Sequence, residues 1–357
     1  MTDPSAFGLP VHVCTMLGKP GCGKSTLLWA INAQGQEGIG PFAFRAVDPD
    51  WELQLNEMWR DYVLKGVPMK GTKEKPIGFS MFGEENCVPR LVIDLEDFRG
   101  EAAYIAAPAD DSDVARLRTR LKGSDSIYLC LDGEHVGAWL RDPRKPTVID
   151  DGLGILTMRS HLVRAKADRK VRNLPTPRVV VLILKRDRLA ESTGLSASDA
   201  YLKFVENAHL LFPDLFDAET DWVSMFSAVR IGAFDNDGHP DPGAIKPVNV
   251  LAGPLFCLYS HLMTTVGDQL AMVKTKEKES GNIEISIKRM STNDLKKWWY
   301  RREISQKRTQ AETNQAETYE TRQDIARAQA SLRRLESLVD LNVVIHKGKV
   351  YRLGDLS

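Results

Sequence analysis

The first residues that could do chemistry lie in the glycine-rich stretch "GKPGCGKST" at 18–26. Its spacing matches G-x-x-x-x-G-K-[ST], in which glycines let successive backbone N–H groups point at an anion. The lysine adds a positive charge for outer phosphates, and the hydroxyl ligates Mg²⁺. An apolar run precedes the stretch and a helical pattern follows it, as a phosphate loop requires. We therefore expect phosphate binding by Gly18, Gly21, Cys22, Gly23, Lys24, Ser25 and Thr26.

The composition is that of a soluble α/β protein without a strong electrostatic preference. The chain has 357 residues, is 43% hydrophobic and has a formal net charge of zero. No attraction of the whole protein to nucleic acid is implied, and we expect no nucleic-acid partner. The five cysteines show no disulfide pattern, and the sequence has no signal peptide and no apolar stretch of membrane-spanning length. We therefore expect a cytoplasmic protein with reduced thiols and no transmembrane segment.

Apolar runs that alternate with helical patterns indicate the fold class. Buried strands are expected at 11–17, 90–95, 126–131, 178–184 and 222–227, with a weaker edge strand at 77–82. Helices are expected at 26–32, 53–63, 114–122, 152–166, 198–211 and 254–265. This order predicts a three-layer α/β domain of the P-loop NTPase type over residues 1–267, with a mostly parallel sheet. Ligands of such sheets bind at the carboxyl ends of the strands, where the glycine-rich loop falls.

The remaining residues, 268–357, have a different composition. A long, mostly charged segment from about residue 292 to 340 is rich in helix formers, and its apolar positions become dense only near its end. We expect an extended helical arm, with a coiled coil as one form of it. The stretch "VVIHKGKVYRL" at 343–353 predicts a small β-hairpin that turns at Lys347-Gly348. The arm is the expected surface for a protein partner or for self-association.

Three further motifs follow the phosphate loop, each at the end of an apolar run. The first is Asp97-Phe98-Arg99-Gly100, in which the carboxylate can hold Mg²⁺ and the Gly100 N–H can reach the terminal phosphate. The second is Lys185-x-Asp187, and the third is Ser227-Ala228. D-x-x-G alone is a weak motif. Its position after the phosphate loop, together with the two motifs that follow it in order, makes a phosphate and metal role more specific.

With these four motifs the chain resembles the translation-factor-related (TRAFAC) GTPases, over roughly residues 11–265. Within that class it looks closest to bacterial GTPase-like proteins of defence or conflict systems, sometimes called double-GTPases. The resemblance implies GTP/GDP and Mg²⁺ as ligands. It implies that Lys24 binds the outer phosphates, that Ser25 and Asp97 hold Mg²⁺, and that Gly100 senses the third phosphate. Guanine would be recognised by Asp187, by the stem of Lys185 and by the N–H of Ala228, beside Ser227. Thr72 would be the mobile threonine that ligates Mg²⁺, and Glu101 would take the place of a water-positioning glutamine.

The chain departs from the family pattern at two positions. Leu184 stands where asparagine or threonine is expected before Lys185, which removes a polar link between the base loop and the phosphate loop. Glu101 is charged and cannot donate an amide hydrogen as glutamine does, so intrinsic hydrolysis is expected to be slow or to use another group.

Two other functions stay open at this point. Asp132 and Glu134 follow another apolar strand and resemble the Mg²⁺ and base pair of ATPases. Alternatively, the protein is a nucleotide-stabilised scaffold that hydrolyses little, which Glu101 favours. The function expected first is a Mg²⁺-dependent GTPase switch that acts through a protein partner, with Lys24, Thr72 and Glu101 as its catalytic residues.

Overall fold

The computed structural model describes residues 8–67, 77–98, 112–143, 152–232, 240–290, 301–338 and 342–352. The chain divides into two compact units. The first comprises residues 1–258 and 337–357, and the second comprises residues 259–336. No helix within the described ranges is long and apolar enough to cross a membrane.

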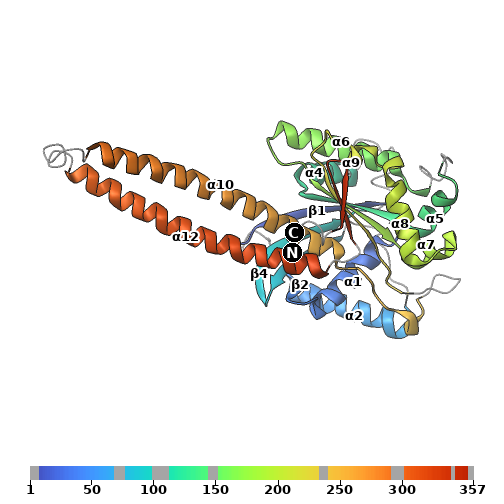
Figure 1. The fold of residues 1–357 in the computed structure, drawn as a ribbon. Helices are drawn as coiled ribbons and strands as arrows, with labels where there is room; N and C mark the ends of the chain where they lie inside the picture. The colour runs from blue at the N-terminus through green and yellow to red at the C-terminus, as the bar shows by residue number, and fades with distance from the viewer. Residues whose placement is uncertain are drawn as a thin grey trace. The chain divides into compact units, whose positions relative to one another are not determined.

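The first unit is built on a mixed 9-stranded sheet (Figure 1). Its five central strands are parallel and lie in the order β4-β1-β5-β6-β7. Their bounds are β4 Val88–Asp97, β1 Val11–Gly18, β5 Ser126–Asp132, β6 Arg178–Leu184 and β7 Val223–Ala228. These are the five strands that the apolar runs predict, because a strand covered on both faces needs apolar side chains on both.

The outer strands of the sheet are antiparallel. On one side β3 (Ile77–Glu85) pairs with β4, and β2 (Phe42–Ala46) pairs with β3 and forms the edge. On the other side β8 (Val343–His346) pairs with β7, and β9 (Lys349–Arg352) pairs with β8. The sheet is therefore mostly but not wholly parallel. The edge strand β2 was not predicted, and it displaces the predicted edge strand one place inward.

Helices cover both faces of this sheet (Figure 1). Alternate side chains of β5 and β6 point into a large apolar core with α4, α5, α6 and α8. The opposite face carries α1, α2 and the first turns of α10 (Ala252–Met290). The helix bounds are α1 Lys24–Glu37, α2 Pro49–Lys65, α4 Ser112–Gly123, α5 Gly133–Arg141, α6 Ile155–Val171, α7 Arg186–Thr193, α8 Ala197–Asn207 and α9 Pro213–Phe216. Short 3₁₀ turns occupy Ala208–Leu210 and Pro242–Ala244.

The second unit contains most of two long helices, α10 (Ala252–Met290) from residue 259 onward and α12 (Arg301–Leu338) up to residue 336. Lys276 pairs with Glu317, and Glu277 pairs with Arg322, so the two helices run side by side. Buried apolar residues such as Val273 and Ile325 recur along them. These observations agree with a helical arm. The predicted domain boundary after residue 267, however, falls inside the continuous helix α10, and the terminal hairpin belongs to the sheet of the first unit.

Candidate functional site

The glycine-rich loop connects the end of β1 to the start of α1. Gly23 has a φ of 105°, a left-handed conformation that favours glycine, and α1 begins at the next residue. A Cβ on Gly18 would lie 2.7 Å from the backbone oxygen of Cys130, so only glycine fits there without displacing β5. The N-terminus of α1 has no side-chain cap and no acidic residue in its first turn. Its N–H groups and dipole therefore favour an anion.

Lys24 folds back over this loop. Its Nζ atom donates hydrogen bonds to the backbone oxygens of Gly18 at 2.8 Å and Lys19 at 3.2 Å, and the side chain is buried. Cys22 is also buried, and its Sγ lies 3.9 Å from the Lys24 ammonium. Burial raises the pKa of the Cys22 thiol although the Lys24 charge opposes this, so Cys22 is a small neutral side chain within the loop.

The serine of the loop meets the carboxylate of the second motif. Ser25 Oγ donates a 2.8 Å hydrogen bond to Asp97 Oδ2 across 72 residues of sequence. Asp97 is fully buried, and burial raises its carboxyl pKa although the Lys24 charge and the Ser25 hydrogen bond lower it. Its second oxygen, Oδ1, is buried with no hydrogen-bond partner among the described residues. A half-buried hydroxyl and a buried carboxylate with a spare oxygen are hard oxygen donors of the kind that fit Mg²⁺.

The alternative carboxylate, Asp132, has other partners. Its Oδ2 accepts a 2.6 Å hydrogen bond from Lys185 Nζ, and its Oδ1 accepts one from the Glu134 N–H at 2.9 Å. Asp132 is thus the N-cap of α5 and the ion-pair partner of the base motif. Both oxygens of Asp132 accept hydrogen bonds, whereas Asp97 Oδ1 has no partner among the described residues, so the geometry favours Asp97 as the metal carboxylate.

The two motifs predicted to recognise a base lie side by side. Strands β6 and β7 pair with Ile183 opposite Ala228, and the Arg186 N–H donates to the Val229 oxygen at 3.0 Å. Lys185 is the N-cap residue of α7 and has a left-handed conformation with a φ of 57°. Asp187 lies in the first turn of the same helix, and its pKa is raised by burial and less by the Glu191 charge.

Leu184 gives a packing contact where the family pattern has a polar one. The side chain is buried at the end of β6, and its Cδ1 would lie 3.7 Å from a Cβ built on Gly23. It therefore packs beside the glycine-rich loop at ordinary van der Waals distance. The base loop and the phosphate loop are in contact here through an apolar side chain, a role that its position in the sequence did not suggest.

Three of the other predicted residues are not described by the structure, and one is buried in the sheet. Thr72, Gly100 and Glu101 lie outside the described residues. Ser227 is buried in β7, and its Oγ has no hydrogen-bond partner within the described ranges. Sequence reasoning missed Tyr62 on α2, whose pKa is raised by burial and further by the charge of Asp187. This electrostatic effect links a buried aromatic residue of α2 to the base motif. In the sequence, Tyr62 stands seven residues after Leu55, a spacing that marks the buried face of a helix and not a functional residue.

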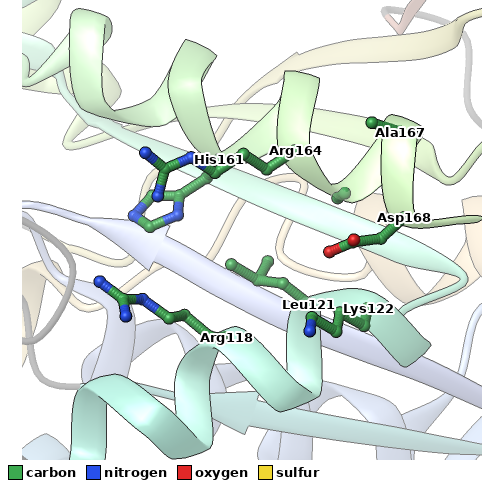
Figure 2. A pocket seen from close by; sticks show the side chains of 8 residues that line it. Arg118, Leu121, Lys122, His161, Arg164, Ala167 and Asp168 are labelled. Carbon is green, nitrogen blue, oxygen red and sulfur yellow. The ribbon is translucent and has the colours of Figure 1, made fainter. Parts of the chain in front are cut away.

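A separate cleft of about 280 Å³ lies between α4 and α6 and is lined by Arg118, Leu121, Lys122, His161, Arg164, Ala165, Ala167 and Asp168 (Figure 2). The cationic side chains from the two helices face each other across it (Figure 2). None of the residues predicted for phosphate, metal or base binding lines this cleft, so it is not part of the candidate site.

Comparisons with known proteins add no further assignment. No protein-family model matches the chain, and a comparison with curated proteins gives no match either.

Proposed function

We propose that the protein is a Mg²⁺-dependent P-loop GTPase that binds GTP and GDP and hydrolyses GTP. The observation that carries this proposal is the Ser25–Asp97 hydrogen bond beside the buried Lys24 ammonium. It joins the two sequence motifs that a phosphate and metal site needs, which lie far apart in the chain. The uncapped N-terminus of α1 supports the same proposal, because it offers backbone donors to phosphate at the same place.

The chain's own residues have distinct roles in this proposal. Lys24 exchanges its loop carbonyls for phosphate oxygens and neutralises charge on the transferred group. Ser25 and Asp97 would hold Mg²⁺, which neutralises phosphate charge when bound. The Gly18 and Gly23 backbone shapes the loop around the phosphates. Glu101 would accept a proton from, or orient, the attacking water, and Gly100 and Thr72 would respond to the third phosphate.

Specificity for guanine is proposed to come from Asp187. A carboxylate can accept hydrogen bonds from both the ring N–H and the exocyclic amine of guanine, whereas adenine offers no such pair. Asp187 is half-buried, so a base that leaves this carboxylate unsatisfied would bind weakly. A hydrogen bond to a charged group is worth about 1.5–3 kcal/mol, which is roughly 10- to 150-fold in affinity. The Leu184 packing contact supports a base loop held beside the phosphate loop without the family's polar link.

Competition binding tests this proposal. GTP, ATP and xanthosine triphosphate are competed against a fluorescent guanine nucleotide on wild type and on Asp187→Asn. Wild type should prefer GTP over ATP by at least roughly 10-fold, and Asp187→Asn should weaken GTP and strengthen xanthosine triphosphate. Glu191→Gln is the matched control, because it removes a neighbouring carboxylate on the same helix that forms an ion pair with Arg188. Equal affinity of wild type for GTP and ATP would contradict the guanine assignment.

We further propose that the helical pair is the surface through which nucleotide state reaches a protein partner or a second copy of the chain. Large apolar side chains are exposed along it: Met263, Leu270, Met272, Ile285 and Tyr319. We propose that these side chains contribute to an apolar surface for association, as exposed apolar patches commonly do. The scaffold alternative differs only in turnover, so phosphate release measured on the pure protein separates it from the GTPase.

A further inference from the structure

A cluster of metal-ligating side chains lies inside the first unit, away from the residues proposed to bind nucleotide. His12 and Cys14 lie on β1, and Cys257 lies on the first turns of α10. One ligand atom from each of the three lies within 4.8 Å of the others. Cys14 and Cys257 are fully buried, and their Sγ atoms are 3.5 Å apart.

The fold brings these residues together by simple periodicity. His12 and Cys14 are two residues apart on a strand, so their side chains emerge from the same face of the sheet. Cys257 lies four residues after Gly253 and so shares its face of α10. A Cβ at Gly253 would lie only 2.6 Å from the Tyr128 ring, so glycine lets the helix approach the sheet closely at this point.

Two neighbours hold the cluster in place. Ser126 Oγ lies 2.8 Å from His12 Nε2 and fixes the imidazole ring. The Tyr128 hydroxyl lies 3.0 Å from Cys257 Sγ, where it can donate a hydrogen bond to a thiolate or supply an oxygen ligand. Metal sites commonly have partners of this kind around their direct ligands, because such partners orient the ligands.

The sulfur separation suits a shared metal ion better than a disulfide. Two thiolates at about 2.3 Å from a tetrahedral zinc ion are roughly 3.8 Å apart, whereas bonded sulfurs are about 2.05 Å apart. The observed 3.5 Å therefore needs only a small adjustment for a metal and a much larger one for a disulfide. Two sulfurs and one imidazole are the soft and borderline donors that zinc and copper(I) prefer over Mg²⁺.

We propose that His12, Cys14 and Cys257 form a binding site for a thiophilic metal ion, zinc in the first place, which ties the start of α10 to the strand that leads into the glycine-rich loop. Binding deprotonates both thiols, and the two protons pass to solvent, while the neutral imidazole contributes a nitrogen lone pair. Tyr128 provides the fourth contact, either as a ligand or through a hydrogen bond to the Cys257 sulfur.

The test uses the full-length protein, purified without chelator in the presence of a phosphine reductant. Zinc content is measured by mass spectrometry of the metal, and the zinc-free protein refolded with Co²⁺ is examined by absorption spectroscopy. Wild type should hold about one zinc ion per chain and show thiolate-to-cobalt charge-transfer absorption. Cys14→Ser and Cys257→Ser should lose most of the zinc and this absorption. Cys87→Ser is the matched control, because Cys87 is an exposed thiol in the turn between β3 and β4.

A second measurement keeps the proposal testable if a serine variant folds poorly. Chelation of zinc from wild type should lower its melting temperature by roughly 5–10 °C, as expected for loss of a ligand held well above its dissociation constant. Three results would each overturn the site: reduced wild type that folds without retaining zinc or showing the cobalt band, a Cys257→Ser protein that keeps its metal, or a Cys14–Cys257 disulfide in the reduced protein.

Discussion

Replacing Asp97 by asparagine separates the effect of this carboxylate on the stability of the nucleotide-free protein from its effect on Mg²⁺-GTP affinity. The side chain is fully buried, and burial raises its pKa against the opposing effects of Lys24 and Ser25. A carboxyl group with a raised pKa in the folded state contributes stability below its ordinary pKa and loses that contribution as the pH rises. Ionisation of this carboxyl group therefore destabilises the nucleotide-free protein.

Asp97→Asn should accordingly unfold no lower than wild type in the absence of nucleotide. If the neutral amide gains about 1 kcal/mol in the free energy of unfolding, the melting temperature rises by roughly 2–4 °C. The difference in melting temperature between the variant and wild type should be larger at pH 7 than at pH 4, because wild type loses stability as the Asp97 carboxyl group ionises. Thermal melts followed by circular dichroism at the two pH values measure this difference.

Binding should change in the opposite direction. The asparagine keeps the shape but lacks the charge that holds Mg²⁺ beside Ser25, and loss of a charge-assisted contact of about 1.5–3 kcal/mol weakens Mg²⁺-GTP binding roughly 10- to 150-fold. Affinity measured with excess chelator should change little. Titration of a fluorescent GTP analogue at fixed Mg²⁺ concentrations gives both values.

Asp132→Asn is the control for this experiment, because asparagine can still cap α5 while the Lys185 ion pair is lost. It should retain the Mg²⁺ dependence of wild type. The opposite result, in which Asp132→Asn abolishes the Mg²⁺ dependence and Asp97→Asn preserves it, would place the metal carboxylate on β5. That result would contradict the GTPase proposal and favour the ATPase alternative.

Burial raises the pKa of Asp221, but hydrogen bonds from Lys166 and Thr176 outweigh it and lower the pKa to about 2. The ionised carboxylate therefore stabilises the fold above its ordinary pKa, and this stabilisation is lost as the pH falls toward 2. Wild type should therefore melt higher than Asp221→Asn at pH 7, and the gap should narrow at pH 3, as calorimetry can measure. Gly253→Ala should lower the melting temperature by several degrees, because the new methyl group meets the Tyr128 ring; an unchanged melt would contradict the close approach. Replacing residues 269–327 by a short Gly/Ser loop keeps β8 and β9 in the sheet, so the shortened protein should bind nucleotide and lose self-association or partner binding in light scattering. An unchanged mass, with and without partner, would remove the arm as an assembly surface.

The sequence predicts the central sheet well because parallel strands buried on both faces are continuous apolar runs. Edge strand β2 escapes this reasoning: its sequence "FAFRA" is short, and Arg45 interrupts the apolar pattern where that side of the strand is exposed. Helix α7 escapes it as well, because "RDRLAEST" buries only Leu189 and has little periodicity. The hairpin at the C-terminus is visible in the sequence, but its pairing with β7 depends on a contact more than a hundred residues away.

The candidate site shows the same division between local and distant information. Lys24 and Ser25 follow from a local motif. Asp97 and Asp132 both stand at the ends of apolar strands, and the sequence prefers Asp97 through the D-x-x-G motif that it begins. The three-dimensional neighbours distinguish the two carboxylates more directly, since Ser25 bonds to one and Lys185 to the other. The Leu184 contact with the glycine-rich loop likewise depends on the two strand ends meeting.

The central claim is that the loop at 18–26 binds the phosphates of a nucleotide, and isothermal titration of Mg²⁺-GTP into wild type and Lys24→Ala tests it most directly. Lys19→Ala is the control, because that neighbouring lysine stands at a position that the motif leaves variable. Wild type and Lys19→Ala should bind tightly, and Lys24→Ala should bind at least roughly 100-fold more weakly, since one ammonium faces several phosphate charges. Binding of GTP by Lys24→Ala at wild-type affinity, or no binding by folded wild type, would contradict the account.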